Sequence, residues 1–229
     1  MTNSLRPIDE IMTVWDVLTP DERQFLRTNF TVHHFKKNEM IQIEGEIPTH
    51  MMVLESGKAK VYKEGVGSRA QIIRMLKPGE HFGYRAIIAN EPYNTNVSAF
   101  EASTVYMIKA EIFISILKNN NSFCYRFLEE MATDLGASDA RTVNLTQKHI
   151  RGRLAEALLM LKNRYGMEED GATISIYLSR EDLANLSNMT TSNAIRTLSA
   201  FATEEIIALD GRKIKILDIN KLKRISRLG

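Results

Sequence analysis

The sequence predicts an α+β fold made of a small β-rich domain, one long helix and a C-terminal winged helix-turn-helix. Three observations predict it. Short β-type runs separated by glycines fill residues 31–109, an apolar stripe without proline follows over 121–147, and two short helical patterns precede a hairpin signal near the C-terminal end. Strands this short and closely spaced are typical of a small sandwich or barrel rather than of alternating βαβ units. We therefore expect domains at 1–120, 121–147 and 148–229.

Composition and cysteine content narrow the class of protein. The chain has 229 residues, of which 44% are hydrophobic and 25% charged, as in ordinary globular domains. The N-terminal stretch has no apolar run like that of a signal peptide, and no window holds the roughly 18 apolar residues of a membrane span, so we expect a cytoplasmic protein without a membrane partner. The single cysteine, Cys124, cannot provide the four thiolates of a usual iron–sulfur cluster.

The N-terminal part begins with two helical patterns, at 8–17 and 20–28. The second carries helix-start signals, with Thr19 as N-cap, Pro20 at the first helical position and Glu22 in a capping box. The strands of the predicted barrel come from seven β-type runs separated by turn residues: 31–35, 40–43, 51–54, 59–62, 71–75, 97–99 and 104–108.

The stretch 79–99 predicts a strand that ends in a turn at Gly83, followed by a short helix, a polar loop and a new strand. Phosphate cradles are often built in this order. The free N–H groups and the dipole at the start of a helix favour an anion. This stretch is therefore the candidate effector site of the domain.

The pattern over 121–147 predicts one long amphipathic helix, because Phe123, Phe127, Met131 and Leu135 recur every four residues. Two interpretations stay open. The helix can cover its own barrel with this face, or it can pair with the same helix of a second copy. About 25 residues is long for a simple connector, so we favour a homodimer through Phe127, Met131 and Leu135.

Residues 148–229 carry the positive charge excess of the chain, with 14 Lys and Arg against 10 Asp and Glu. Neutralising phosphates with such side chains releases condensed counterions, so the excess favours a nucleic-acid surface. An amphipathic helix is expected at 150–165, with Gly166 closing it, and a strand at 172–178.

Two helical patterns joined by a tight turn occupy 179–198 and predict a helix-turn-helix. Ser179, with Asp182 three residues later, is the expected N-cap of the first helix, and Thr190 that of the second. An Asp-Gly hairpin signal at 210–211 completes a winged helix. The expected core positions are Leu183, Ala184, Leu186, Met189, Ile195 and Leu198.

Four motifs in a fixed order carry a resemblance to a known family: LESGKAKV at 54–61, LKPGEHFG at 76–83, GRLAEALL at 152–159 and SREDLA at 179–184. With them the chain resembles the superfamily of bacterial regulators that includes the cyclic-AMP receptor protein and the fumarate-nitrate regulator. The resemblance implies a homodimeric transcription factor with an N-terminal β-roll of the cyclic-nucleotide-binding type, a double-stranded jelly roll. It also implies double-stranded DNA and RNA polymerase as partners.

In the members of this family that bind cyclic AMP, a Glu after the turn glycine holds the ribose and an Arg-Ser pair holds the phosphate. Here Tyr84 stands in place of the Glu, and Asn94 and Thr95 in place of the pair. Asn94 offers no charge for a guanidinium–phosphate contact. We therefore expect an effector other than cyclic AMP, while a different small ligand and no ligand both stay open.

Other residues near the expected pocket bear on the effector. Ser138 and Asp139 fall where relatives close the pocket with hydroxyl groups of the long helix, and Asp139 adds a negative charge. Arg85 is near in sequence, but we expect it to point elsewhere. Haem stays open as an effector, with His81 the best single histidine, although a hydrogen-bonded structural histidine is the simpler interpretation.

The first turns of the second helix are expected to enter the major groove of DNA. Arg196 matches an arginine that contacts a guanine in relatives, while Ile195 and Leu198 are expected to face the core. Thr191 and Ser192 stand where relatives usually have Glu or Arg, so the half-site of the inverted repeat should differ from theirs. The expected DNA-binding residues are Ser179, Arg180, Thr190, Thr191, Ser192, Asn193, Arg196 and Lys213.

A second function class stays open, a cyclic-nucleotide-type regulatory subunit that acts through protein partners. Arg196 and the wing-tip cations Arg212 and Lys213 favour DNA over that alternative. An enzyme is not expected, because the sequence has no Ser/His/Asp or Cys/His constellation, no metal-ligand spacing and no phosphate-binding loop of the G-x-x-x-x-G-K type.

Overall fold

The structure is a computed structural model that describes residues 15–65 and 69–228. The chain forms two compact units: the first unit comprises Met1–Glu64 and Ile72–Asp134, and the second unit Gly65–Gln71 and Leu135–Gly229.

The helix predicted at 8–17 lies mostly outside the described residues. Its described end is a short 3-10 helix, η1 (Trp15–Val17). The next helix, α2 (Pro20–Thr28), starts as predicted, because the Thr19 side chain accepts from the Glu22 N–H and the Glu22 carboxylate accepts from the Thr19 N–H.

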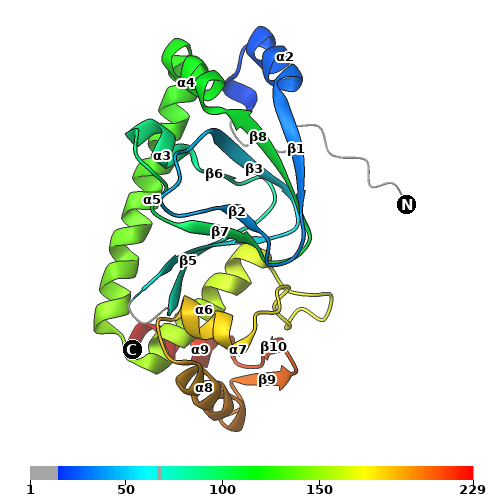
Figure 1. Cartoon of the computed structure of the whole chain (residues 1–229). Coiled ribbons are helices and arrows are strands. Elements are labelled where there is room, and N and C mark those ends of the chain that lie inside the picture. Colours follow the sequence, from blue (N-terminus) through cyan, green and yellow to red (C-terminus); the bar gives the residue numbers. More distant parts are fainter. Residues whose placement is uncertain (1–14, 66–68, 229) are drawn as a thin grey trace. The chain divides into compact units, whose positions relative to one another are not determined.

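Two four-stranded sheets form the β-roll (Figure 1). Antiparallel pairing places Val53 opposite Tyr106 in one sheet and Val61 opposite Val97 in the other. The α+β fold class is confirmed. The strand order is β1 (Phe30–Phe35), β8 (Ser103–Lys109), β3 (His50–Ser56) and β6 (His81–Phe82) in the first sheet, and β2 (Met40–Gln42), β7 (Asn96–Ala99), β4 (Ala59–Glu64) and β5 (Ala70–Leu76) in the second.

Both faces of strand β3 are buried, because successive side chains of a strand point to opposite faces. Met52 and Leu54 join a core with residues of both sheets. Met51 and Val53 join a second core, to which helices contribute Leu26, Tyr84, Phe113, Phe123 and Phe127. These side chains come from α2, α3 (Tyr84–Ala89), α4 (Ala110–Asn119) and α5 (Asn121–Gln147), and α5 is the predicted long helix.

The second unit contains the predicted winged helix-turn-helix. Its elements are α6 (Ile150–Tyr165), α7 (Arg180–Leu186), α8 (Thr191–Thr203), the hairpin β9 (Ile207–Asp210) and β10 (Lys213–Ile216), and α9 (Ile219–Leu228). The prediction of a regular strand at 172–178 is wrong. Only isolated bridges form there, at Thr173 and Ile174, since the Asp170 carboxylate accepts from the N–H groups of residues 172 and 173 and holds a turn.

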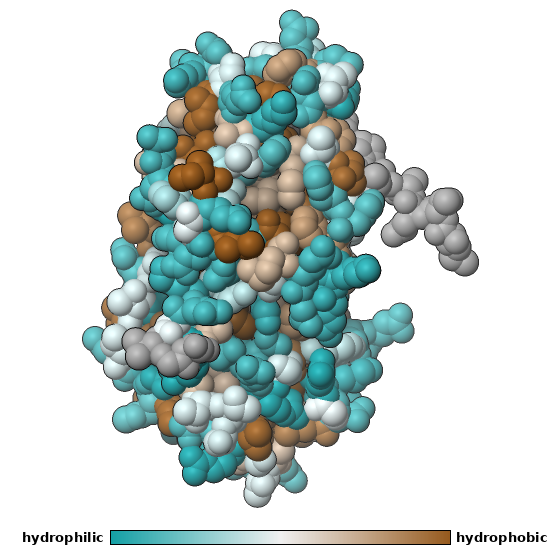
Figure 2. All heavy atoms as spheres, viewed as in Figure 1, coloured by the Kyte–Doolittle hydropathy of each residue, from teal (hydrophilic) through white to brown (hydrophobic). Residues whose placement is uncertain are grey.

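Hydrophilic side chains cover most of the face seen in Figure 2, and apolar side chains appear there in small separate groups. None of the described helices is long and apolar enough to cross a membrane.

Candidate functional site

The candidate effector site within residues 79–99, here the cradle, has its turn at Gly83, which has a φ of +81°. A Cβ at this position would lie 2.9 Å from the Met52 side chain and 3.2 Å from the carbonyl oxygen of His50. Only glycine combines this backbone conformation with such close packing. The sequence motif therefore folds into the turn that it predicts, and α3 begins at the next residue.

Tyr84, the first residue of α3, is buried, and its hydroxyl donates to the Asp134 carboxylate at 3.3 Å. Arg74 pairs with the same carboxylate at 3.0 Å. The Tyr84 ring packs against Phe127 at a centroid distance of 5.2 Å. Burial, and next the charge of Asp134, raise the pKa of Tyr84 to about 12, so this side chain stays neutral and does not offer ribose hydroxyls the charge of a carboxylate.

Tyr93 is the other buried tyrosine of the cradle. Its hydroxyl donates to the His50 carbonyl at 3.4 Å and lies 3.6 Å from the place of a Cβ on Gly83. Burial raises its pKa to about 12. Asn94, by contrast, is exposed, and its carbonyl accepts from Lys63 at 3.0 Å. The hydroxyl of Tyr93, rather than the amide of Asn94, therefore lies beside the turn glycine.

The remaining predicted pocket residues are spread over the chain. Thr95 accepts from the Gln42 side chain through both its carbonyl and its hydroxyl. Arg85 pairs with the exposed carboxylate of Glu91 on the loop after α3. Ser138 and Asp139 are exposed and belong to the second unit. In the first unit Tyr93 lies beside Gly83 and belongs to one core, whereas Tyr84 packs into the other core with Phe127.

His81 is a buried side chain that packs on Phe127 at 4.9 Å between ring centroids. Its Nε2 is hydrogen-bonded to the carboxylate of Glu130 on α5. A hydrogen bond of this kind is what the interpretation as a structural histidine expects, while Nδ1 is buried without a partner among the described residues. Within residues 15–65 and 69–228, no three His, Cys, Asp or Glu side chains are grouped so as to hold a metal ion.

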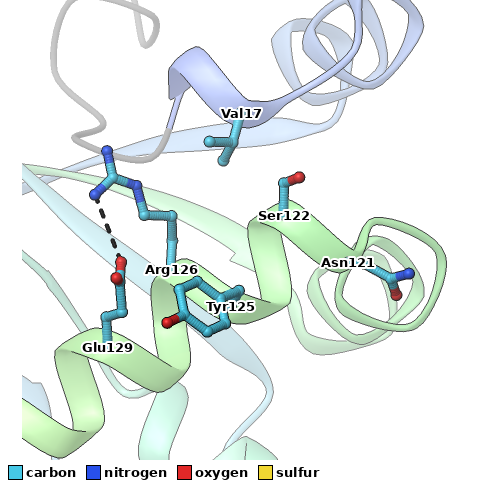
Figure 3. A pocket seen from close by; sticks show the side chains of 6 residues that line it. All are labelled: Val17, Asn121, Ser122, Tyr125, Arg126 and Glu129. Carbon is cyan, nitrogen blue, oxygen red and sulfur yellow. Dashed lines mark ion pairs between the residues drawn. The ribbon is translucent and has the colours of Figure 1, made fainter.

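Two open grooves lie along the first half of α5. One, of about 370 Å³, is bordered by His81, Tyr84 and Arg74 together with acidic residues of α5. The other, of about 540 Å³, lies beside η1 at the start of α5, where Arg126 reaches over to Glu129 (Figure 3). Its lining residues are Val17, Asn121, Ser122, Tyr125, Arg126 and Glu129.

The structure separates the predicted dimer residues on α5. Phe127 is 1% exposed in the second core of the roll, and Met131 packs against the same core. Leu135, in contrast, is 64% exposed. Phe127 therefore corrects the prediction, because a side chain buried in its own roll does not face a second copy, whereas Met131 is half-buried and its place in a dimer stays a prediction. The large apolar side chains exposed on α5 are Tyr125, Leu128, Leu135 and Val143.

The helix-turn-helix has the predicted caps. The Ser179 hydroxyl accepts from the Asp182 N–H at 2.9 Å, and the Thr190 hydroxyl accepts from the Asn193 N–H at 3.3 Å. Arg196 is exposed, and its guanidinium donates to the side-chain oxygen of Asn193 one turn earlier. Asn193 therefore holds Arg196 against α8 in the free protein.

Ile195 corrects the predicted core, because it is 46% exposed. The buried positions of α8 are Ala194, Thr197, Leu198 and Phe201, which follow the i, i+3, i+4, i+7 spacing of one helix face. Small or polar types at two of these positions hid the face from sequence reasoning. The side chains exposed on the first turns are Thr191, Ser192, Ile195 and Arg196.

The predicted phosphate contacts have partners inside the second unit. The Arg180 guanidinium donates to the carbonyl of Gly211 in the wing turn at 2.8 Å, so it ties α7 to the hairpin. The Lys213 ammonium lies 5.4 Å from the centroid of the Tyr177 ring and 3.8 Å from a carboxylate oxygen of Glu168. Lys213 is thus placed beside the wing and half exposed.

Comparisons with known proteins agree with this architecture. A family model described as a cyclic nucleotide-binding domain matches residues 32–120, and one described as a Crp-like helix-turn-helix domain matches residues 152–225. The chain is 23% identical to the CRP-like cAMP-activated global transcriptional regulator of Mycobacterium tuberculosis over 84% of this chain and 87% of that protein. It is also 23% identical to the anaerobic regulatory protein of Bacillus subtilis, over 90% and 86% of the two chains.

Solved structures show the same fold. A crystal structure of a Crp/Fnr-family protein from Eubacterium rectale superposes with a TM-score of 0.78 at 21% identity, covering 95% of this chain and 99% of that one. FixK2 from Bradyrhizobium japonicum gives a TM-score of 0.76 at 21% identity over 86% and 96%. With a cyclic-nucleotide-type roll followed by a Crp-like DNA-binding helix-turn-helix, the chain belongs to the superfamily of transcription regulators of the cyclic-AMP receptor protein and the fumarate-nitrate regulator.

Proposed function

We propose that the protein is a homodimeric transcription regulator that recognises an inverted repeat in double-stranded DNA through the first two turns of α8. The observation that carries the proposal is the exposed face of this helix, where Thr191, Ser192 and Arg196 are accessible. The second helix of this motif enters the major groove with its N-terminal residues. Arg196 is the side chain suited to guanine O6 and N7, and Asn193 steadies its guanidinium.

In this proposal residues 148–229 are the DNA-binding domain and residues 1–120 the sensory domain. Lys213 supplies a phosphate contact from the wing. The hydroxyls of Ser179 and Thr190 are engaged in capping, so their contribution to phosphate binding comes from the helix starts that they fix. Arg180 acts on DNA through the wing, whose turn it holds.

The second copy pairs through the exposed apolar positions of α5. Leu128 and Leu135 are one heptad apart, and Val143 follows two turns later. Such spacing favours a seam between two parallel helices. A dimer presents two α8 helices to half-sites about one DNA turn apart. RNA polymerase is the further partner that we propose for a regulator bound near a promoter.

The effector that we propose for the roll is a small ligand other than cyclic AMP. Tyr84, in place of the Glu that holds the ribose, is neutral, and Asn94, in place of the phosphate-binding Arg, offers no charge. Arg74, which lies beside Tyr84, is already paired with the Asp134 carboxylate at 3.0 Å. A buried phosphate without a cationic partner is costly, so this cradle disfavours cyclic AMP.

Selection of binding sites from random double-stranded DNA tests the proposed function. The native full chain should enrich an inverted repeat with a guanine in each half-site. Arg196→Ala should relax the preference at that base, because a bidentate arginine–guanine pair contributes about 1–3 kcal/mol of discrimination. Lys213→Ala, the matched control, should weaken all sequences about equally and reduce the salt dependence.

Two outcomes would contradict the proposal at different levels. An unchanged base preference in Arg196→Ala would show that Arg196 contacts only phosphate. The absence of any enriched inverted repeat with the native chain would contradict the DNA-binding regulator and favour a regulatory subunit that acts through protein partners.

A further inference from the structure

Ile195 is a large apolar side chain on the exposed face of α8, and 46% of it is accessible to solvent. The other exposed residues of the first two turns are Thr191, Ser192 and Arg196, all of them polar. Ile195 lies one helical turn after Thr191 and directly before Arg196. It therefore belongs to the face that the proposed function presents to DNA.

Ile195 is not one of the buried residues that form the core of the helix-turn-helix. That core contains Leu198 and Phe201, each at most 1% exposed, together with Ala194, which is fully buried. A residue next to Ala194 on a helix is rotated by about 100° from it, which turns Ile195 away from the core. Single exposed apolar residues are common on protein surfaces, so exposure alone carries no conclusion. The position of Ile195 beside a base-contacting arginine is what makes it informative.

The major groove offers one prominent apolar group to such a side chain, the C5-methyl group of thymine. Guanine and adenine present only polar edges there, and unmodified cytosine presents an amino group. Burying the Ile195 side chain against a thymine methyl removes apolar surface of both partners from water. A polar base edge in the same place would lose hydration without gaining a hydrogen bond.

We propose that Ile195 is a specificity-determining residue that contacts a thymine methyl next to the guanine recognised by Arg196. The inference rests on the proposed DNA-binding function and adds a second base to its half-site. Successive residues of a helix advance by about 1.5 Å, and stacked bases of one strand are about 3.4 Å apart. Neighbouring side chains such as Ile195 and Arg196 therefore address the same or adjacent base pairs.

The test replaces thymine by deoxyuridine at single positions of the inverted repeat that the native chain selects. This change removes the C5-methyl group and leaves base pairing intact. At the thymine beside the guanine, the native protein should bind about fourfold more weakly per substituted half-site, the effect of one buried methyl group. Ile195→Ala should bind the thymine and deoxyuridine sites almost equally, and Ile195→Val should retain part of the discrimination.

Two controls keep the result specific. Ile195→Ala should keep the thermal unfolding temperature of the native protein, because the side chain is exposed. Ser199→Ala, a truncation of an exposed side chain later on α8 and outside the proposed DNA contacts, should keep the thymine preference.

The outcomes separate this inference from the proposed function. An inverted repeat without thymine beside the guanine, equal binding of both DNAs by the native protein, or discrimination that persists in Ile195→Ala would each overturn the role of Ile195 while leaving the regulator intact. Failure of the native chain to select any inverted repeat would contradict the proposed function itself.

Discussion

Two buried tyrosines define the chemistry of the cradle at the scale of single residues. The fold fixes an acceptor for each hydroxyl, the Asp134 carboxylate for Tyr84 and the His50 carbonyl for Tyr93. Both groups stay protonated because burial raises their pKa values to about 12. Both side chains are consequently neutral, Tyr93 with its hydroxyl beside Gly83 and Tyr84 in the core that contains Phe127.

These pKa values predict how stability depends on pH. In the unfolded chain both tyrosines ionise near pH 10, whereas in the folded protein they keep their protons to about pH 12. The folded state then binds more protons, so the free energy of unfolding should fall as the pH rises through this window. Urea unfolding at a series of pH values above about 9 measures the slope.

Tyr84→Phe and Tyr93→Phe should each make that slope shallower. Tyr125→Phe is the matched control, because the Tyr125 side chain is 60% exposed. Equal slopes in all three variants would show that other groups cause the loss of stability at high pH.

At the scale of elements, α5 carries apolar side chains on two faces, one buried in the roll and the other exposed. Phe123 and Phe127 are buried in the roll, whereas Leu128 and Leu135 are exposed. A glutamate at Leu135 should therefore put two charges into the proposed seam and shift the dimer toward monomer, with little effect on the roll. Sedimentation velocity at micromolar concentration measures the change. Thr133→Glu, an exposed position on the same helix, should stay dimeric, and a Leu135→Glu variant that remains dimeric would contradict this seam.

The C-terminal end of α5 is tied to the helix-turn-helix through Arg153 on α6. Its guanidinium donates to the carbonyls of Leu145 and Asn188, both at 3.1 Å. The Leu145 carbonyl lies in the last turn of α5, and Asn188 lies in the turn after α7. A cation at the C-terminal end of a helix also interacts favourably with the helix dipole. Arg141 on α5 adds a contact with the Leu186 carbonyl at 3.4 Å.

Arg153→Lys keeps the charge but removes the planar fork that reaches two carbonyls at once. Amide hydrogen exchange should become faster at the end of α5 and in the α7–α8 turn, and stay unchanged in the roll. Arg224→Lys, an exposed change on α9, serves as the control. Unchanged exchange in Arg153→Lys would show that the tie contributes nothing to local stability.

At the scale of the whole molecule, two compact units share one continuous helix, and the division falls between Asp134 and Leu135. Phe127 fixes the first half of α5 in the roll, and the Arg153 contacts fix the second half in the DNA-binding unit. Each unit therefore has its own contacts with the element that joins them.

The proposed effector chemistry makes a prediction for the whole chain. Cyclic AMP at micromolar concentration should give no binding heat in calorimetry and should not change the affinity for the selected DNA, because Tyr84 and Asn94 replace charged side chains by neutral ones. A dissociation constant in the low micromolar range would contradict this. An effector-free DNA-binding measurement provides the baseline.

Local chemistry determined much of the fold directly from the sequence. The caps at Thr19, Ser179 and Thr190, the turn at Gly83 and the Asp-Gly hairpin all formed as predicted, since each depends on neighbouring residues alone. The order of the roll, the long helix and the winged helix followed from hydrophobic periodicity and from the family motifs.

The tertiary structure decided which face of each element is buried. An interval of four residues advances a helix by about 400°, so an every-fourth stripe drifts by about 40° per step. Over three steps from Phe123 to Leu135 the drift reaches about 120°, which carries the stripe from the roll to solvent. Ile195, which is exposed, and Tyr93, which is buried, show the same limit of sequence reasoning. Apolar character is a property of the residue, whereas burial depends on which surface of the fold lies opposite it.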